Sequence, residues 1–79
     1  MNVRLRYFAV LRDQRGLEEE SVETEARTPS QLYAQLSERH RFRLPSQMVR
    51  AAVNGAFVDE SYELQDGDEV VFIPPVAGG

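Results

Sequence analysis

The chain has 79 residues, of which 42% are hydrophobic and 28% are charged. This size and composition are typical of one small globular domain with a single core, and they exclude a long disordered segment. The formal net charge is -4, and no basic cluster of the kind that binds nucleic acid occurs. Because the chain contains no cysteine, disulfides, thiolate metal sites and a cysteine nucleophile are excluded.

The amino-terminal residues alternate between polar and apolar types from the start. A signal peptide would instead show a basic head followed by an apolar block. No apolar run approaches the ~20 residues that a membrane-spanning helix needs. We therefore expect an unprocessed cytoplasmic protein with neither a membrane nor a nucleic acid among its partners.

The first half of the chain predicts two strands and one main helix. Residues 2–7 alternate polar and apolar side chains, which is the period of a half-buried strand. Residues 11–16 predict a short helical turn closed by glycine, and residues 17–24 predict a charged strand at a sheet edge. A helix should run from Thr28, which can cap it, to about His40, because proline and glutamine follow Thr28 at the favoured positions.

Two residues in this half have uncertain roles. Phe8 breaks the alternation of the first strand, so it is either a packing residue at the strand end or an exposed apolar contact. His40 is the only histidine, and no nucleophile or second metal ligand accompanies it. We expect a structural or solvated role for His40 near the end of its helix, where a cation is mildly favoured.

The second half predicts three strands and their turns. Residues 42–48 read as an irregular connection whose apolar members cover the end of the core. Residues 50–58 predict a hairpin, because Asn-Gly at its centre readily adopts the positive φ angles of a type I′ turn. Residues 61–64 predict a short helical turn and residues 65–68 a tight turn. The aspartates of that tight turn lack the further oxygen ligands of a calcium loop, so we expect no metal site.

The last strand, residues 70–73, is apolar without alternation. It is therefore covered on both faces or has one face reserved for a partner, and it should lie in the middle of the sheet. A long crossover lets the first and last strands pair in parallel. We predict an α+β fold of the ubiquitin-like β-grasp type, with a mixed five-stranded sheet and one main helix in residues 1–73, followed by an extended tail in residues 74–79.

The tail carries the candidate functional group. Pro74 and Pro75 end the sheet pairing and favour an extended chain. Gly78 and Gly79 place no side chain beside the terminal carboxylate, so the chain end could enter a narrow channel about 20 Å from the domain. The chain has no recognisable Ser-His-Asp set and no phosphate-binding glycine loop, so we expect no independent catalysis. Activation of the Gly79 carboxylate as an acyl-adenylate would permit attack by sulfur or by an amine.

Several segments together resemble the small subunits of molybdopterin synthase, a family of ubiquitin-like sulfur carriers. The resemblance covers essentially the whole chain, and its carboxyl-terminal block is the most specific part. The segments that carry it are Tyr7-Phe8-Ala9 followed by Arg12 and Gly16, then Ala52-Val53-Asn54, Asp66-Gly67-Asp68-Glu69-Val70 and Pro74-Pro75-Val76-Ala77-Gly78-Gly79.

The resemblance implies that an E1-like adenylyltransferase uses ATP to activate Gly79 and that a sulfurtransferase system makes its thiocarboxylate. The tail then enters the large subunit, where its sulfur converts cyclic pyranopterin monophosphate to the dithiolene of molybdopterin. The chain would bind no cofactor and would act as a non-catalytic, sulfur-donating subunit. Two small subunits would sit at opposite ends of a large-subunit dimer. The residues implied to line the inserted tail are Pro74, Pro75, Val76, Ala77 and Gly78.

The resemblance also implies an apolar contact surface for the large subunit, formed by Phe8, Phe57 and Ile73.

Three alternative functions remain open. The chain could be the sulfur carrier of thiamine thiazole synthesis, a ubiquitin-like modifier joined to lysines through Gly79, or an interaction domain with an idle tail. The pair Pro74-Pro75 favours the molybdopterin family over the thiazole one.

Overall fold

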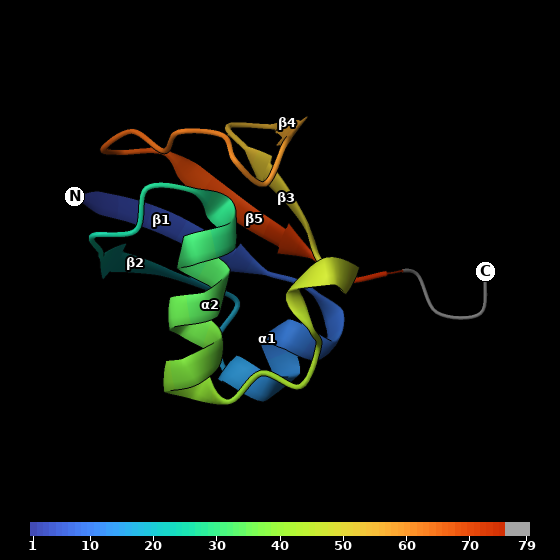
Figure 1. The fold of residues 1–79 in the computed structure, drawn as a ribbon. Coiled ribbons are helices and arrows are strands. Elements are labelled where there is room, and N and C mark those ends of the chain that lie inside the picture. Colours follow the sequence, from blue (N-terminus) through green and yellow to red (C-terminus); the bar gives the residue numbers. More distant parts are fainter. Residues whose placement is uncertain (76–79) are drawn as a thin grey trace.

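The computed structural model describes residues 1–75, which form a five-stranded mixed sheet crossed on one face by a helix (Figure 1). The strand order is β2-β1-β5-β3-β4, with β1 and β5 parallel and the other pairs antiparallel. The elements are β1 (Asn2–Tyr7), α1 (Ala9–Arg15), β2 (Glu19–Glu23), α2 (Pro29–His40), the 3-10 helix η1 (Ser46–Met48), β3 (Arg50–Val53), β4 (Ala56–Val58) and β5 (Glu69–Ile73). The predicted α+β β-grasp architecture is confirmed, with the acidic strand at one edge and the last strand in the centre.

Local sequence explains why α2 and the β3–β4 hairpin form. The Thr28 hydroxyl accepts a hydrogen bond from the Gln31 backbone N–H at 3.2 Å, which caps the start of α2. In turn, the Gln31 side-chain oxygen accepts a hydrogen bond from the Arg27 N–H at 2.9 Å. Asn54 and Gly55 have φ angles of 52° and 90°, as a type I′ hairpin turn requires.

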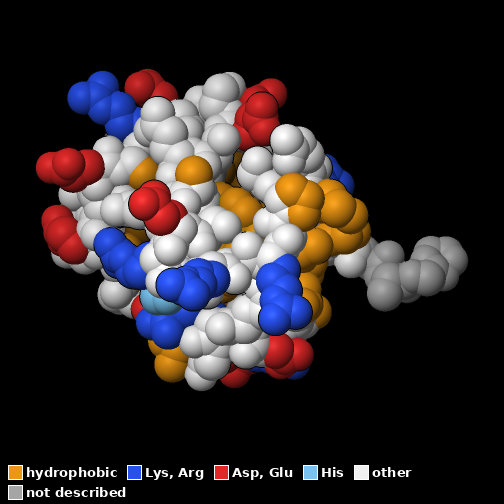
Figure 2. Space-filling model, turned by 60° about the horizontal axis from the view of Figure 1, so that its bottom comes forward, with side chains coloured by type: hydrophobic (Ala, Val, Ile, Leu, Met, Phe, Trp, Pro, Cys, Tyr) orange, Lys and Arg blue, Asp and Glu red, His pale blue; other side chains and the backbone are white. Residues whose placement is uncertain are grey.

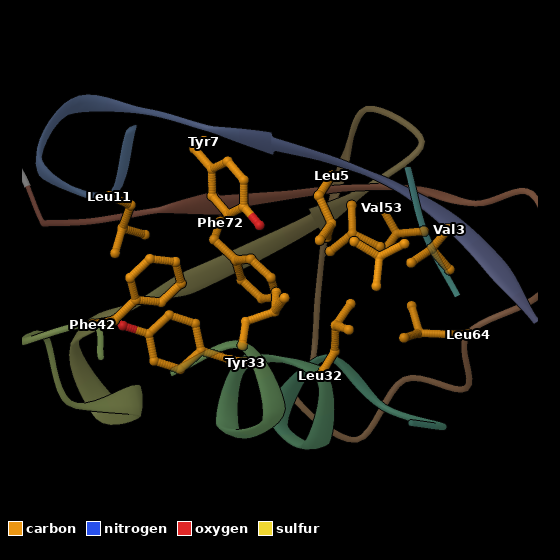
Figure 3. Close-up of a cluster of buried hydrophobic side chains, with 13 residues drawn as sticks. Val3, Leu5, Tyr7, Leu11, Leu32, Tyr33, Phe42, Val53, Leu64 and Phe72 are labelled. Carbon is orange, nitrogen blue, oxygen red and sulfur yellow. The ribbon is translucent and has the colours of Figure 1, made fainter. Parts of the chain in front are cut away.

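The core lies between α2 and the sheet (Figure 3). The apolar positions of β1 and the stripe Leu32, Tyr33 and Leu36 of α2 are buried, as their spacing predicts. Tyr33 stacks on Phe42 and meets Phe72 edge-on, with ring centroids 5.7 and 5.3 Å apart. Phe42 thus closes one end of the core, which confirms the covering role expected for the connection after α2.

A polar cluster lies beside the aromatic end of the core. Glu20 accepts a hydrogen bond from the Tyr7 hydroxyl at 2.7 Å and two from the Arg15 guanidinium at 2.8 Å. Burial raises the pKa of Tyr7 well above its usual value, and the Arg15 hydrogen bonds hold the pKa of Glu20 below its usual range. Burial also lowers the pKa of the half-buried His40, and Arg15 acts in the same direction. The His40 ring also lies 5.9 Å from the Phe42 ring, so His40 packs partly against the end of the core.

Three predicted boundaries are corrected. Helix α1 begins at Ala9 rather than Leu11, because the Phe8 carbonyl accepts hydrogen bonds from the Leu11 and Arg12 N–H groups and so starts the helix earlier. Strand β2 covers Glu19–Glu23 rather than residues 17–24, because its pairing with β1 runs only from Asn2↔Glu23 to Arg6↔Glu19. The connection after α2 is not wholly irregular, since it contains η1.

Residues 61–64 do not form the predicted helical turn. Instead, the Tyr62 N–H donates to the Asp59 carbonyl at 3.0 Å, and the Asp59 carboxylate accepts from the Ser61 N–H and hydroxyl. This aspartate-capped turn satisfies its backbone locally and does not propagate as a helix. The chain then extends so that Leu64 can enter the core, where its N–H donates to the Arg27 carbonyl at 2.8 Å.

The acidic turn before β5 is structural, as predicted. The buried Asp68 carboxylate accepts from the Asn54 side-chain amide at 2.9 Å and from the Gln65 N–H at 2.8 Å. The Asp66 carboxylate accepts from the Asn2 N–H at 2.7 Å. Both aspartates therefore tie this turn to other parts of the sheet.

Candidate partner-binding face

One face of the sheet packs against α2, and strand registry identifies the side chains on the opposite face. The pairs Arg6↔Val71, Ala52↔Val71 and Ala52↔Phe57 place these residues in one row across β1, β5, β3 and β4. Along β5, Val70 and Phe72 are buried in the core, whereas Val71 and Ile73 are half-buried on the other side. The apolar run of β5 therefore has one face in the core and one face on what we call the open face of the sheet.

The structure brings the three predicted contact residues to this open face. Phe57 is 56% exposed and lies opposite Ala52. Ile73 pairs with Arg50, one residue beyond the Ala51↔Phe72 pair that faces the core. Phe8 is 41% exposed, and its ring lies 5.8 Å from the guanidinium carbon of Arg6, which is on the open face. Phe8 is thus an exposed apolar residue and not the strand-end packing residue of the alternative reading.

Arginines accompany the two exposed phenylalanines. Besides the Arg6 contact with Phe8, the guanidinium carbon of Arg50 lies 4.1 Å from the centroid of the Phe57 ring. Such cation-π contacts hold the arginine side chain against the aromatic face. Arg50 is not among the contact residues predicted from the sequence, although the alternation of its hairpin strand already puts it on the same face as Ala52.

The tail root, by which we mean Pro74 and Pro75, lies at the same end of the sheet as Phe8 and Arg50. Strand β5 ends at Ile73 as predicted, Pro74 is buried and Pro75 is exposed. Because β1 and β5 run in parallel, Phe8 follows β1 at this end, while antiparallel β3 begins here with Arg50. Figure 2 shows hydrophobic side chains gathered at this end of the domain. The predicted tail residues Val76, Ala77, Gly78 and Gly79 lie outside the described residues.

Exposed apolar residues missed by the sequence analysis extend this end of the domain. Met48 of η1 is 49% exposed and Val10 of α1 is 39% exposed. Met48 lies two residues before Arg50, and Val10 lies two residues after Phe8. Arg50 and Phe8 both lie at the end of the sheet where the tail begins. The candidate site is therefore an exposed, partly apolar surface and not an enclosed cavity.

Residues 1–75 contain neither a metal-binding cluster nor a membrane-spanning helix. In this range no three acidic or histidine side chains come close enough together to hold a metal ion. The helices of this range are also too short and too polar to cross a membrane.

The sheet order and the crossing helix define a ubiquitin-like β-grasp domain, and comparisons with known proteins refine this class. The ThiS family matches residues 5–79. The molybdopterin synthase sulfur carrier subunit of Escherichia coli (strain K12) is 35% identical over 80 residues, which cover 98% of this chain and 99% of that protein. A putative molybdopterin converting factor subunit 1 from Pyrococcus furiosus is 34% identical with a TM-score of 0.80, covering 96% of this chain and 99% of that chain.

A third relative was solved as an assembly. The structure is a complex of subunits 1 and 2 of the molybdopterin-converting factor from Helicobacter pylori 26695, in which the matching chain is 28% identical with a TM-score of 0.68 and both chains are covered at 100%. This chain belongs to the ThiS family. Two predictions from the sequence are therefore confirmed, namely the family resemblance and the β-grasp fold.

Proposed function

We propose that this chain is the sulfur-carrier small subunit of a molybdopterin synthase. The observation that carries the proposal is the 35% identity to the E. coli sulfur carrier over 98% of the chain. The family match also reaches residue 79, so it includes the glycine whose carboxylate would carry the sulfur. In this proposal the chain works in the cytoplasm and is not an enzyme by itself.

The first chemical step activates Gly79. A carboxylate oxygen of Gly79 attacks the α-phosphorus of ATP on an E1-like adenylyltransferase, and pyrophosphate leaves. The product is an acyl-adenylate, in which AMP is a better leaving group than the oxygen of a free carboxylate. The lack of a side chain on Gly78 and Gly79 suits an active site that must enclose the chain end.

The second step loads the sulfur. A donor at the sulfide oxidation level attacks the acyl carbon, the bond to AMP breaks, and Gly79 is left as a thiocarboxylate. The loaded tail, including Pro74, Pro75, Val76 and Ala77, then enters the large subunit. There the sulfur passes to cyclic pyranopterin monophosphate, and water returns Gly79 to the carboxylate. Because a dithiolene has two sulfur atoms, each product molecule consumes two loaded carriers.

The open face would dock on the large subunit, with Phe8, Phe57 and Ile73 as its apolar contacts. This docking is supported by the exposure of both phenylalanines beside the tail root and by the two-subunit assembly of the H. pylori relative. Large aromatic side chains that leave water at the centre of an interface supply much of its binding energy. We propose the family's heterotetramer of two small and two large subunits as the working assembly.

A reconstitution tests the function. The purified chain is incubated with the adenylyltransferase, ATP and sulfide, and its intact mass is measured. We expect a gain equal to the exchange of one oxygen for one sulfur at Gly79. Adding the large subunit and cyclic pyranopterin monophosphate should return the original mass and yield a dithiolene. A variant that lacks Gly79 is the control and should gain no mass.

The acceptor separates the alternatives. Sulfur transfer to a thiazole synthase in place of the pterin would support the thiamine pathway. Adducts on lysine side chains through Gly79 would support a protein modifier. Normal dithiolene formation with the chain lacking Gly79 would show that the tail is idle and would support the interaction domain. Each of these three results would refute the proposed function.

A further inference from the structure

Arg50 has an unusual position on the open face. It is the first residue of β3 and pairs with Ile73, the last residue of β5, so it lies beside the root of the tail. Its guanidinium carbon is 4.1 Å from the centroid of the Phe57 ring. The arginine therefore lies between two of the three proposed contact residues, where a partner that covers both must also cover Arg50.

The charge of Arg50 is not neutralised within residues 1–75. On the same face, Arg4 and Arg6 lie 3.3 and 3.8 Å from the carboxylate oxygens of Glu19. No carboxylate in the described part of the chain comes within ion-pair distance of the exposed Arg50. Arg50 thus differs from its basic neighbours in having its charge available to a partner.

The stacking on Phe57 also prepares Arg50 for recognition. Contact with the Phe57 ring restricts the long Arg50 side chain, and the planar guanidinium holds its N–H donors in a fixed fork. Two parallel N–H donors in this arrangement match the two oxygens of a carboxylate. Burial of the guanidinium without such an acceptor would leave an uncompensated charge, which opposes binding strongly.

We propose that Arg50 forms an ion pair with a carboxylate on the docking surface of the large subunit. This inference rests on the proposed function and adds a specificity determinant to it. The matching surface is apolar opposite Phe57 and Ile73 and carries an acidic side chain opposite Arg50. Because the chain has a net charge of -4, an acidic partner surface gains no general attraction, and the local pair serves to fix the orientation of docking.

The test measures the dissociation constant of the full-length chain with its large subunit at several salt concentrations. Arg50→Met keeps an unbranched apolar stem, and we expect binding about 30-fold weaker or more, as for truncation of one member of a buried charge pair. Affinity should also depend less steeply on salt, because one charge pair is gone. Arg50→Lys should recover part of the loss, and Arg50→Glu should bind more weakly than Arg50→Met.

Two controls separate the ion pair from other effects. Arg39→Met makes the same charge change on exposed α2, away from the open face, and should leave the affinity within about twofold, as for a surface change distant from the contact. Phe57→Leu removes the stacking partner but keeps an apolar side chain. Arg50→Met should still weaken binding in the Phe57→Leu background if the arginine pairs with a carboxylate.

The outcomes distinguish this inference from the proposed function. If the wild-type chain does not bind the large subunit, the proposed function fails. If the wild type binds but Arg50→Met has the same affinity and salt dependence, the ion pair is refuted. If Arg50→Met causes no further loss of affinity in the Phe57→Leu background, Arg50 acts only by positioning the Phe57 ring, and the ion pair is refuted. An effect confined to adenylation would assign the carboxylate to the activating enzyme and overturn the inference. Restoration of Arg50→Glu binding by an acidic-to-lysine change on the large subunit would identify the partner residue.

Discussion

Truncation of Phe57 to alanine should separate binding from folding. A phenylalanine side chain has roughly 200 Å² of surface, and Phe57 is 56% exposed in the free domain, so about 110 Å² remains for a partner to bury. At about 25 cal/mol per Å², full burial is worth about 2.8 kcal/mol, or about a 100-fold change in dissociation constant. The other roughly 90 Å² is already covered in the free domain, so at the same coefficient the free energy of unfolding should fall by no more than about 2 kcal/mol, including the lost contact with Arg50.

The assay is calorimetric titration of the large subunit with the wild-type chain and with Phe57→Ala, together with urea unfolding of each free domain. Tyr62→Ala is the matched control. Tyr62 is 37% exposed in the segment after β4, which contacts the start of α2 through the Ser30 N–H and the Glu60 carbonyl. Its truncation should not affect the dissociation constant. Equal affinity of Phe57→Ala and wild type, with both domains folded, would refute the docking role of the open face.

Two further predictions concern stability. Leu36→Ala should lower the free energy of unfolding by about 2 to 5 kcal/mol in urea titrations, because Leu36 is 0% exposed and its loss leaves a cavity; a loss below about 1 kcal/mol would contradict the packing described. Glu20→Gln should remove the charged hydrogen bonds to Arg15, a cost of about 1.5 to 3 kcal/mol at neutral pH. Because the folded-state pKa of Glu20 is depressed, its stabilisation is present above the unfolded-state pKa of about 4.3 and is lost as pH falls through the folded-state value. The wild type and Glu20→Gln should therefore converge in stability at low pH, and a constant difference across the acid range would contradict the assignment.

Much of the fold could be predicted because local patterns and long-range packing agree. The alternation in β1, the capped start of α2 and the Asn-Gly turn of the hairpin each express a backbone preference that the tertiary structure keeps. The predicted element boundaries were wrong where the structure of one segment depends on its contacts with another. Strand β2 is shorter than its pattern because its pairing with β1 covers only Glu19–Glu23, and the predicted turn at residues 61–64 gives way to an Asp59-capped turn that leads Leu64 into the core.

The candidate site shows the same division. A resemblance in sequence named Phe8, Phe57 and Ile73 as contact residues, whereas the broken alternation of the first strand left open whether Phe8 packs at the strand end or is exposed. The exposure of Phe8 and its contact with Arg6 settle this, and strand registry places Phe57 and Ile73 on the open face, because the face that a side chain occupies depends on which residue lies opposite it in the neighbouring strand. The stacking of Arg50 on Phe57 depends on the same registry together with the geometry of the hairpin.

The sequence by itself determined the strands, the main helix, the hairpin turn and the order in which they follow, because these depend on neighbours within a few residues. Only the tertiary structure decided which face of β5 is open and which arginines there are already paired with acids. It also decided that Glu20 binds both Tyr7 and Arg15. These features join residues that are distant along the chain, so they exist only once the strands have paired and the helix has covered one face of the sheet.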